Sequence, residues 1–336
     1  MYQSDYRGNS TTDNENTLFS IVPLNACTYR HMSDDSTFHI NVNTLEKGLV
    51  SKEYPVFVEN ESDLRFVVQY INSSDSFTKF CTEQKKGGTR TRLYYKTLCE
   101  YKMLIPSLNE QHIIADYFDN LDHLITLHQR KCDELKKVKK FMLQKMFPKK
   151  GEKNPEIRFD GFTNDWEQRK VYEMFKVTRG YVLPATDTSE EISDEMPYPV
   201  YSSQTKDNGL MGYYSDYLYE DAITWTTDGA NAGTVNFRYG RFYCTNVCGV
   251  LLSDKVEASK AVAEALNNVA KRYVSYVGNP KLMNNVMADI QIKIPTSREE
   301  RAKISSYFSN LDHLITLHQC KCKSCKKYYK CTRKLK

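Results

Sequence analysis

Apolar residues recur at alternating spacings of four and three over two long stretches, and each stretch predicts a helix. This is the a/d seam of a coiled coil, sustained over about four heptads. Each predicted helix follows an Ile-Pro pair, where proline disfavours helix before it and Ser107 or Thr296 can cap the first turn. The seam positions are Ile114, Phe118, Leu121, Ile125, His128, Cys132, Leu135 and Met142 in the first stretch, and Ile304, Phe308, Leu311, Ile315, His318, Cys322, Cys325 and Tyr329 in the second.

The two stretches are copies of one another. NLDHLITLHQ occurs at residues 120–129 and again, without a gap, at residues 310–319. The distance along the chain from residue 120 to residue 310 is too long for a solenoid, whose repeats run about 20 to 50 residues. The sequence therefore predicts a duplicated unit made of a globular part and a helix, with the two helices able to pair.

The segments outside the helices have a mixed α+β character. Short apolar runs bounded by turn residues predict strands, while two amphipathic runs predict helices. We expect a first globular domain at 1–103, a first helix with its linker at 104–150, a second globular domain at 151–292 and a second helix at 293–336. The predicted strands are Tyr54–Val58, Tyr198–Ser202, Ala222–Thr226, Thr234–Phe237 and Val247–Leu252, and the predicted short helices are Asp63–Tyr70 and Ala258–Val274.

Composition excludes several classes of protein. Of the 336 residues, 26% are charged and 40% hydrophobic, and no apolar run approaches the length of a transmembrane helix. The polar stretch Met1–Arg7 lacks the apolar core of a signal peptide, so we expect a cytoplasmic protein without a membrane partner. The ten cysteines are then expected to be reduced thiols.

The net charge of +5 hides an uneven distribution. Arg130–Lys153 holds ten basic residues and three acids, and Gln319–Lys336 holds eight basic residues and no acid. The two stretches carry +15 together, so the other 294 residues carry −10. A polyanion would therefore bind at local patches, although lysine runs are also common on solvated helix faces.

Signatures of catalysis are absent from the sequence. It contains no phosphate-binding loop, no H-E-x-x-H, no G-x-S-x-G and no dinucleotide fingerprint, and this predicts a protein without catalytic residues or a cofactor of its own. The best metal candidate is the C-terminal cysteine set, but Cys322 and Cys325 fall on the seam and favour a role as small core residues, so no metal is expected. His128 and His318, also on the seam, are expected to set register.

Candidate DNA contacts lie on loops of both globular segments. The first set surrounds Gly87-Gly88, where basic side chains could follow a phosphate backbone, although a solvated loop of this kind is equally common. The second set includes residue types able to contact base edges. The candidates are Lys85, Lys86, Arg90 and Arg92 in the first segment, and Tyr201, Ser202, Ser203, Gln204, Thr227, Asn231, Arg238 and Arg241 in the second.

Nearly the whole chain resembles the DNA-specificity subunit of type I restriction-modification systems. The resemblance rests first on the paired Ile105–Gln111 and Ile294–Glu300 segments, each leading through Tyr-Phe into Asn-Leu-Asp-His-Leu-Ile. Further motifs are Phe162–Glu167, Tyr198–Ser203, Asn208–Tyr213 and Ile223–Gly233, with Gly48–Tyr54 as a counterpart in the first segment.

The resemblance implies two target-recognition domains, each reading half of a split target in double-stranded DNA. Two long helices would pack as an antiparallel coiled coil that sets the distance between the half-sites. Their outer faces would dock methyltransferase subunits and, through them, a restriction nuclease/translocase. Such a subunit is itself non-catalytic. The helix-helix spacer would involve Leu121, Ile125, His128, Leu135, Leu311, Ile315, His318 and Cys322.

The first segment departs from the second. It is shorter by about 30 residues and has no counterpart of the motif around Trp166, so an N-terminally truncated first domain is expected. Two other hypotheses stay open at this point. One is a coiled-coil adaptor, or a silent truncated product, that reads no DNA, and the other is a thiol metalloenzyme built on the C-terminal cysteines.

Overall fold

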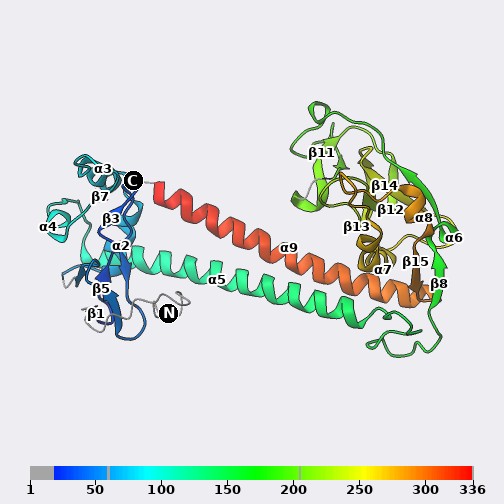
Figure 1. Ribbon diagram of the computed structural model, residues 1–336, viewed down its shortest axis with the longest axis horizontal. Coiled ribbons are helices and arrows are strands. Elements are labelled where there is room, and N and C mark those ends of the chain that lie inside the picture. Colours follow the sequence, from blue (N-terminus) through cyan, green and yellow to red (C-terminus); the bar gives the residue numbers. More distant parts are fainter. Residues whose placement is uncertain (1–18, 59–60, 204–205, 335–336) are drawn as a thin grey trace. The chain divides into compact units, whose positions relative to one another are not determined.

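The computed structural model describes residues 19–58, 61–203 and 206–334, which belong to two compact units. Unit 1 combines Met1–Leu127 with Lys321–Lys336, and unit 2 is His128–Cys320. Both long helices are confirmed, as α5 (Leu108–Lys145) and α9 (Arg298–Lys334) (Figure 1). The units divide both helices, whereas the boundaries expected from the sequence keep the helices whole, so those domain boundaries stay a prediction.

Within its described residues, unit 1 contains three small antiparallel sheets and three short helices. Its two-residue strands are too short to hold a domain by backbone pairing alone, so its helices supply much of the core. The sheets are β1 (Phe19–Val22) with β5 (Gly48–Ser51), β4 (Asn41–Val42) with β2 (Cys27–Thr28) and β6 (Val56–Phe57), and β3 (Met32–Ser33) with β7 (Thr91–Arg92). The helices are α2 (Leu64–Ser73), α3 (Asp75–Glu83) and α4 (Tyr95–Leu98).

An arginine fixes α2 of unit 1 to the first turns of α5. Arg65 donates to Asp116 at 2.7 Å and to Asp119 at 2.8 Å on α5, and also to Asp63, which caps α2. Hydrogen bonds to these carboxylates raise the pKa of Arg65. The core of unit 1 lies beside this junction, and Ala115 of α5 is fully buried in it.

Unit 2 is built on a six-stranded sheet in the order β11-β10-β13-β12-β14-β9. All pairs are antiparallel except β10 with β13. The four strands and the helix predicted for this segment are confirmed, although β13 is longer than expected. The elements are β9 (Phe175–Arg179), β10 (Tyr198–Tyr201), β11 (Leu210–Tyr214), β12 (Tyr219–Thr226), β13 (Val235–Cys244), β14 (Cys248–Ser253), α7 (Lys260–Ala270) and 3-10 turns at Ala185–Asp187, Lys206–Gly209 and Lys271–Tyr273.

The sheet of unit 2 buries apolar residues on both faces. Alternate residues of a strand point to opposite faces, so Ile223 and Trp225 pack into the main core while Ala222 joins a smaller cluster with Phe242. Gly249 has to lack a side chain because a Cβ there would lie 2.1 Å from the ring of Trp225. The indole Nε1 of Trp225 donates to a backbone carbonyl, so this large buried side chain leaves no polar atom unsatisfied.

The start of α9 is bound to the segment that precedes the sheet. Glu300 is 1% exposed, and its carboxylate accepts hydrogen bonds from Arg158 at 2.7 and 2.8 Å and from Trp166 Nε1 at 3.2 Å. Ser297 Oγ accepts from Glu300 N, so Ser297 caps this helix and the expectation for Thr296 was wrong by one residue. Nearby lie the strand pair β8 (Glu167–Lys170) and β15 (Gln291–Ile294) and the short helices α6 (Val171–Met174) and α8 (Asn284–Asp289).

Within each unit, α5 and α9 pair in antiparallel fashion. In unit 1 the rings of Phe118 and Tyr329 lie 5.2 Å apart, and in unit 2 the Nδ1 atoms of His128 and His318 lie 3.0 Å apart. The predicted seam is the least exposed stripe of both helices: Cys132, Ile304, Phe308, Leu311, Ile315 and Cys322 are buried, and the other seam residues are half-buried. Supercoiling of the pair, and the role of these residues as a spacer, stay predictions.

Four charged side chains connect α5, α7 and α9 in unit 2. Lys139 and Lys260 each lie within 3.0 Å of both Glu264 and Asp312. Burial alone would raise the pKa of Asp312, but the ammonium groups of Lys260 and Lys139 outweigh burial and lower it. Glu264 is 4% exposed, so removing a partner leaves charge in a poorly solvated place, which is more costly than losing a surface ion pair.

The substitution Asp312→Asn is expected to lower the melting temperature of the protein at pH 7. Because the pKa of Asp312 is lowered on folding, its stabilising effect is complete above the ordinary value of 3.8 and is lost as pH falls below it. The difference in melting temperature between wild type and variant should therefore shrink from pH 7 to pH 3. The control is Asp289→Asn. Asp289 pairs with Lys170 but is 68% exposed, so this substitution should change the melting temperature little. If the difference in melting temperature is as large at pH 3 as at pH 7, the charge of Asp312 is not what stabilises the protein.

Candidate functional site

Two polar loops of unit 2 come together where parallel strands end. Since β10 and β13 run in parallel, with Tyr201 opposite Cys244, the segments that follow them leave the sheet at the same place. Thr245 N donates to Tyr201 O at 2.9 Å, and Thr245 Oγ1 lies 3.1 Å from Ser202 Oγ. The predicted contacts Tyr201, Ser202 and Ser203 are half-buried in this region, whereas Gln204 lies outside the described residues.

The loop between β12 and β13 joins the same region. Asn231 Nδ2 donates to the carbonyl of Ser203 at 3.4 Å, which brings these two predicted contacts together. Gly233 adopts φ +81°, and a Cβ there would lie 2.8 Å from the side chain of Val274, so the turn requires glycine. On the other side of the loop, Leu282 N donates to the carbonyl of Thr227 at 2.8 Å.

Beside Thr227 is a hollow of about 460 Å³ that is lined mostly by polar and charged residues. Its charged groups are Arg179, Asp228 and Lys281, and an ion pair of 3.6 Å joins the last two. Side-chain amides both donate and accept, and can therefore form paired hydrogen bonds with a base edge, as arginine can with guanine. The remaining lining residues are Thr227, Asn246, Met283, Asn284 and Asn285.

Most residues that line this hollow were not predicted as site residues from the sequence. Of the candidates given above, only Thr227 lines it; Arg179 ends β9, Asn246 lies in the turn between β13 and β14, and one later segment supplies Lys281, Asn284 and Asn285. The asparagines stand in turns and at the start of α8, where asparagine is common for conformational reasons. No local signal distinguishes such residues from ligand-binding ones, so their convergence is visible only in the fold.

Arg238 supports the loop and is not exposed at the surface. It is 8% exposed, its guanidinium lies 3.7 Å from the centre of the Tyr201 ring, and it donates to Thr224 Oγ1 at 3.0 Å and to Asn208 O at 2.8 Å. Burial lowers the pKa of Arg238. Asn208 has φ +56°, a left-handed conformation that asparagine tolerates, which turns its carbonyl toward the arginine. Any contribution of Arg238 to binding would therefore act through the position of Tyr201 and this loop.

Arg241 is exposed and has different partners. Its guanidinium lies 4.8 Å from the centre of the Tyr217 ring and pairs with Glu220 at 3.5 Å. Cys248 lies near Tyr201, and its burial raises the pKa of the thiol to about 11, so this thiol stays protonated and is a poor nucleophile.

In unit 1, three of the predicted basic residues lie on the exposed segment between α3 and β7, and Arg92 lies in β7 itself. Lys85, Lys86 and Arg92 are exposed, and Arg90 is exposed but pairs with Asp34 at 2.8 Å. Tyr94 follows β7, is 55% exposed and stacks on His31. The segment therefore offers cations and an aromatic face to solvent.

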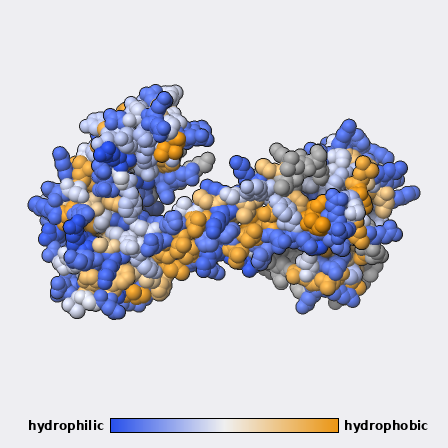
Figure 2. All heavy atoms as spheres, turned by 180° about the vertical axis from the view of Figure 1, so that it is seen from behind, coloured by the Kyte–Doolittle hydropathy of each residue, from blue (hydrophilic) through white to orange (hydrophobic). Residues whose placement is uncertain are grey.

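Exposed apolar side chains mark the outer surface of both long helices. Leu124 and Leu127 of α5 are 41% and 50% exposed, and their repeat counterparts Leu314 and Leu317 of α9 are 40% and 37% exposed. Figure 2 shows apolar side chains gathered over the helical stretch on the face drawn. A duplicated apolar patch favours a partner that binds each copy of the repeat in the same way.

The C-terminal cysteines do not form a metal site in the structure. Cys322 is buried, Cys325 half-buried, and Cys320 and Cys331 are exposed. Across residues 19–58, 61–203 and 206–334, no three histidine, cysteine, aspartate or glutamate side chains are close enough to share a metal ion.

In that same part of the chain, no helix is both long and apolar enough to cross a bilayer.

Comparison with known proteins identifies relatives of the chain. A family model described as "Type I restriction modification DNA specificity domain" matches residues 39–137 and 163–324. A Mycoplasma pneumoniae protein, provisionally named as the N-terminus of a type I specificity subunit, is 37% identical over 140 residues, which are 41% of this chain and 73% of that protein. A second, provisionally named as a type I specificity subunit, is 33% identical over 159 residues, 45% of this chain and 50% of that protein.

The fold also has a solved counterpart. The crystal structure of a type I restriction-modification system S subunit from M. genitalium matches with a TM-score of 0.69, covering 94% of this chain and 83% of that one. The sequence identity is 17%, so this likeness concerns the fold alone.

Replacing Arg238 by methionine is expected to lower the free energy of unfolding of unit 2. The change leaves Asn208 O and Thr224 Oγ1 without their partner inside the protein, with an expected cost of about 2–4 kcal/mol. Urea unfolding followed by tryptophan fluorescence measures it, since Trp225 is buried in unit 2. The control Arg241→Gln removes only exposed contacts and should cost less than about 1 kcal/mol. Equal losses in the two variants would refute a supporting role for Arg238.

Proposed function

The chain belongs to the type I restriction modification DNA specificity domain family, and on this premise we propose that it is the sequence-reading specificity subunit of a type I restriction-modification complex. The observation that carries the proposal is the convergence of loops in unit 2 on a hollow lined by three asparagines, an arginine, a lysine and an aspartate. These groups match the donors and acceptors that base edges present in the major groove.

Each unit would read one half of a split target in double-stranded DNA. In unit 2 the reading surface would combine the hollow at Thr227 with Tyr201, Ser202 and Ser203. In unit 1 the exposed cations of residues 85–92 would hold the backbone, with Tyr94 beside them. The helices α5 and α9, paired through the seam that contains Ile125, His128, Ile315 and His318, would act as the spacer between half-sites.

The chemistry would belong to other subunits. The exposed apolar patches on α5 and α9 support docking of methyltransferase subunits, which would carry the methyl donor, and of the restriction nuclease/translocase through them. The present chain would need no cofactor. It would act in the cytoplasm, where its DNA is.

The test is co-expression with the neighbouring methyltransferase subunit in a host without DNA methylation, followed by mapping of modified adenines by single-molecule sequencing. A two-part motif with a fixed gap supports reading by both units. A one-sided or symmetric motif would mean that unit 2 alone reads DNA. A stable complex that modifies no site contradicts the proposal and favours a coiled-coil adaptor.

In the same assay, Asn246→Ala should relax the motif at one or two positions of one half-site. Loss of a paired amide contact reduces discrimination by about 1–3 kcal/mol, or roughly 5- to 150-fold. Asn164→Ala, an exposed asparagine outside the hollow, serves as the control and should leave the motif unchanged. A motif that is identical in wild type and in Asn246→Ala removes this residue from the reading surface.

The duplicated apolar patches give a separate test of docking. Leu124→Glu with Leu127→Glu should remove one methyltransferase site, and Leu314→Glu with Leu317→Glu the other, each weakening that contact at least about tenfold because a charge would be buried. Mass photometry of the purified complex counts the bound subunits. Asn120→Glu with Asn310→Glu is the matched control on the same helices, at exposed polar positions. Full assembly of all variants would show that the partner binds elsewhere.

A further inference from the structure

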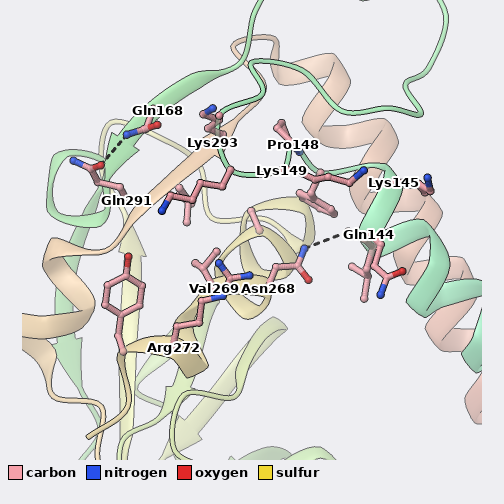
Figure 3. A pocket seen from close by; sticks show the side chains of 17 residues that line it. Gln144, Lys145, Pro148, Lys149, Gln168, Asn268, Val269, Arg272, Gln291 and Lys293 are labelled. Carbon is pink, nitrogen blue, oxygen red and sulfur yellow. Dashed lines mark hydrogen bonds between the residues drawn. The ribbon is translucent and has the colours of Figure 1, made fainter.

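A second hollow of unit 2, of about 850 Å³, is strongly basic and has no part in the site described above. It lies between the end of α5 with the following loop, the β8–β15 strand pair, and α7 with the turn that follows it (Figure 3). Carboxamides contribute further donors, and Gln168 bonds to Gln291 at one side. The cations in the lining are Lys145, Lys149, Lys150, Arg272 and Lys293, and no carboxylate belongs to the lining.

The positive charge of this basic hollow is only partly balanced. Glu156 pairs with Lys145 at 2.6 Å and with Lys149 at 3.4 Å, and Lys293 donates to the backbone carbonyl of Glu152. Lys150 and Arg272 are exposed, and neither has an ion pair within the described part of the chain. One carboxylate thus pairs with two of the five cations.

Two stretches without acidic residues face each other across the basic hollow. Residues 143–151 contain three lysines and no acid, and residues 265–288 contain Lys271, Arg272 and Lys281 and no acid. Ordinary surfaces mix both signs of charge, so two acid-free walls create a local positive potential that attracts an anion.

The second acid-free stretch, residues 265–288, also connects the basic hollow with the proposed reading surface. Arg272 and Tyr273 line the basic hollow, and the same chain segment supplies Lys281, Asn284 and Asn285 to the hollow at Thr227. One continuous segment therefore borders both places. This continuity favours a ligand that extends from one to the other over a separate small anion.

We propose that the basic hollow binds phosphate groups of a DNA strand outside the base-reading loops, in a contact that does not depend on sequence. The inference rests on the proposed function. Lysine and arginine with carboxamide donors suit phosphate oxygens. The aromatic residues of the lining are Phe147, which is buried, and Tyr273, so a platform for stacking successive bases is lacking and the backbone is the part of DNA that fits.

The experiment uses the full chain in complex with its methyltransferase subunit. Dissociation constants are measured between 50 and 200 mM salt for a duplex that carries the modified motif and for an unrelated duplex. The double variant Lys150→Gln with Arg272→Gln should reduce the slope of log K against log salt by about 2, because each lost phosphate contact changes it by about 0.9. Both duplexes should weaken alike, and the modified motif should stay the same.

The control is Lys176→Gln with Lys255→Gln, which removes the same charge from exposed positions of unit 2 outside both hollows. It should leave the slope within about 0.5 of wild type. An equal loss in the control, or an unchanged slope in the double variant, overturns the proposal. A double variant that instead releases the methyltransferase subunit would assign the basic hollow to a protein partner and also overturn it.

Failure of the proposed function would have a different signature. Wild-type complex would then yield no modified motif, and two unrelated duplexes would bind with equal affinity. The slope comparison on either duplex would still decide whether the basic hollow contacts phosphate.

Discussion

Each long helix has one narrow stripe that can be buried, and this limits how the molecule can be built. A mostly polar helix of 37 or 38 residues gains most of its stability in a protein from packing its apolar side against other parts. The two copies bury their stripes along an antiparallel pairing, and charged groups then attach the helices to the globular parts. Arg65 does this in unit 1, and Lys139 with Lys260 in unit 2. Apolar packing along the stripe does not by itself select one orientation of a helix against a globular part. The ion pairs therefore define which globular surface each helix meets.

The starts of the two long helices also show how polar residues are matched to their surroundings. Gln111 and Glu300 each lie in the first turn of a long helix, Gln111 in α5 and Glu300 in α9. Gln111 accepts from the backbone N–H of Asp63 and donates to a carbonyl, a pairing that needs an amide. Glu300 accepts from a guanidinium and an indole, a pairing that needs a carboxylate. Each residue has the hydrogen-bonding capacity that its own globular part requires.

Periodicity predicted the helices and the main strands well, because burial of a stripe leaves a regular trace in the sequence. The 4,3 spacing of Leu121, Ile125 and His128 marks the least exposed side of α5, and β12 and β14 followed from apolar runs. The hollow at Thr227 left no such trace, since Arg179, Asn246 and Asn285 are brought together by sheet pairing between distant segments. Arg238 illustrates the converse: its residue type suggested a base contact, while its place in β13, opposite Ala222, buries it.

The contact between His128 and His318 has a consequence for the symmetry of the molecule. The two residues are equivalent in the repeat and meet through the same atom, Nδ1, at 3.0 Å. A hydrogen bond needs one donor and one acceptor, so one imidazole donates through an Nδ1–H group and the other accepts at an Nδ1 without hydrogen. The two identical side chains therefore have different roles in this contact. The duplication is exact in sequence over these ten residues, yet the two histidines cannot be equivalent in their hydrogen bonding.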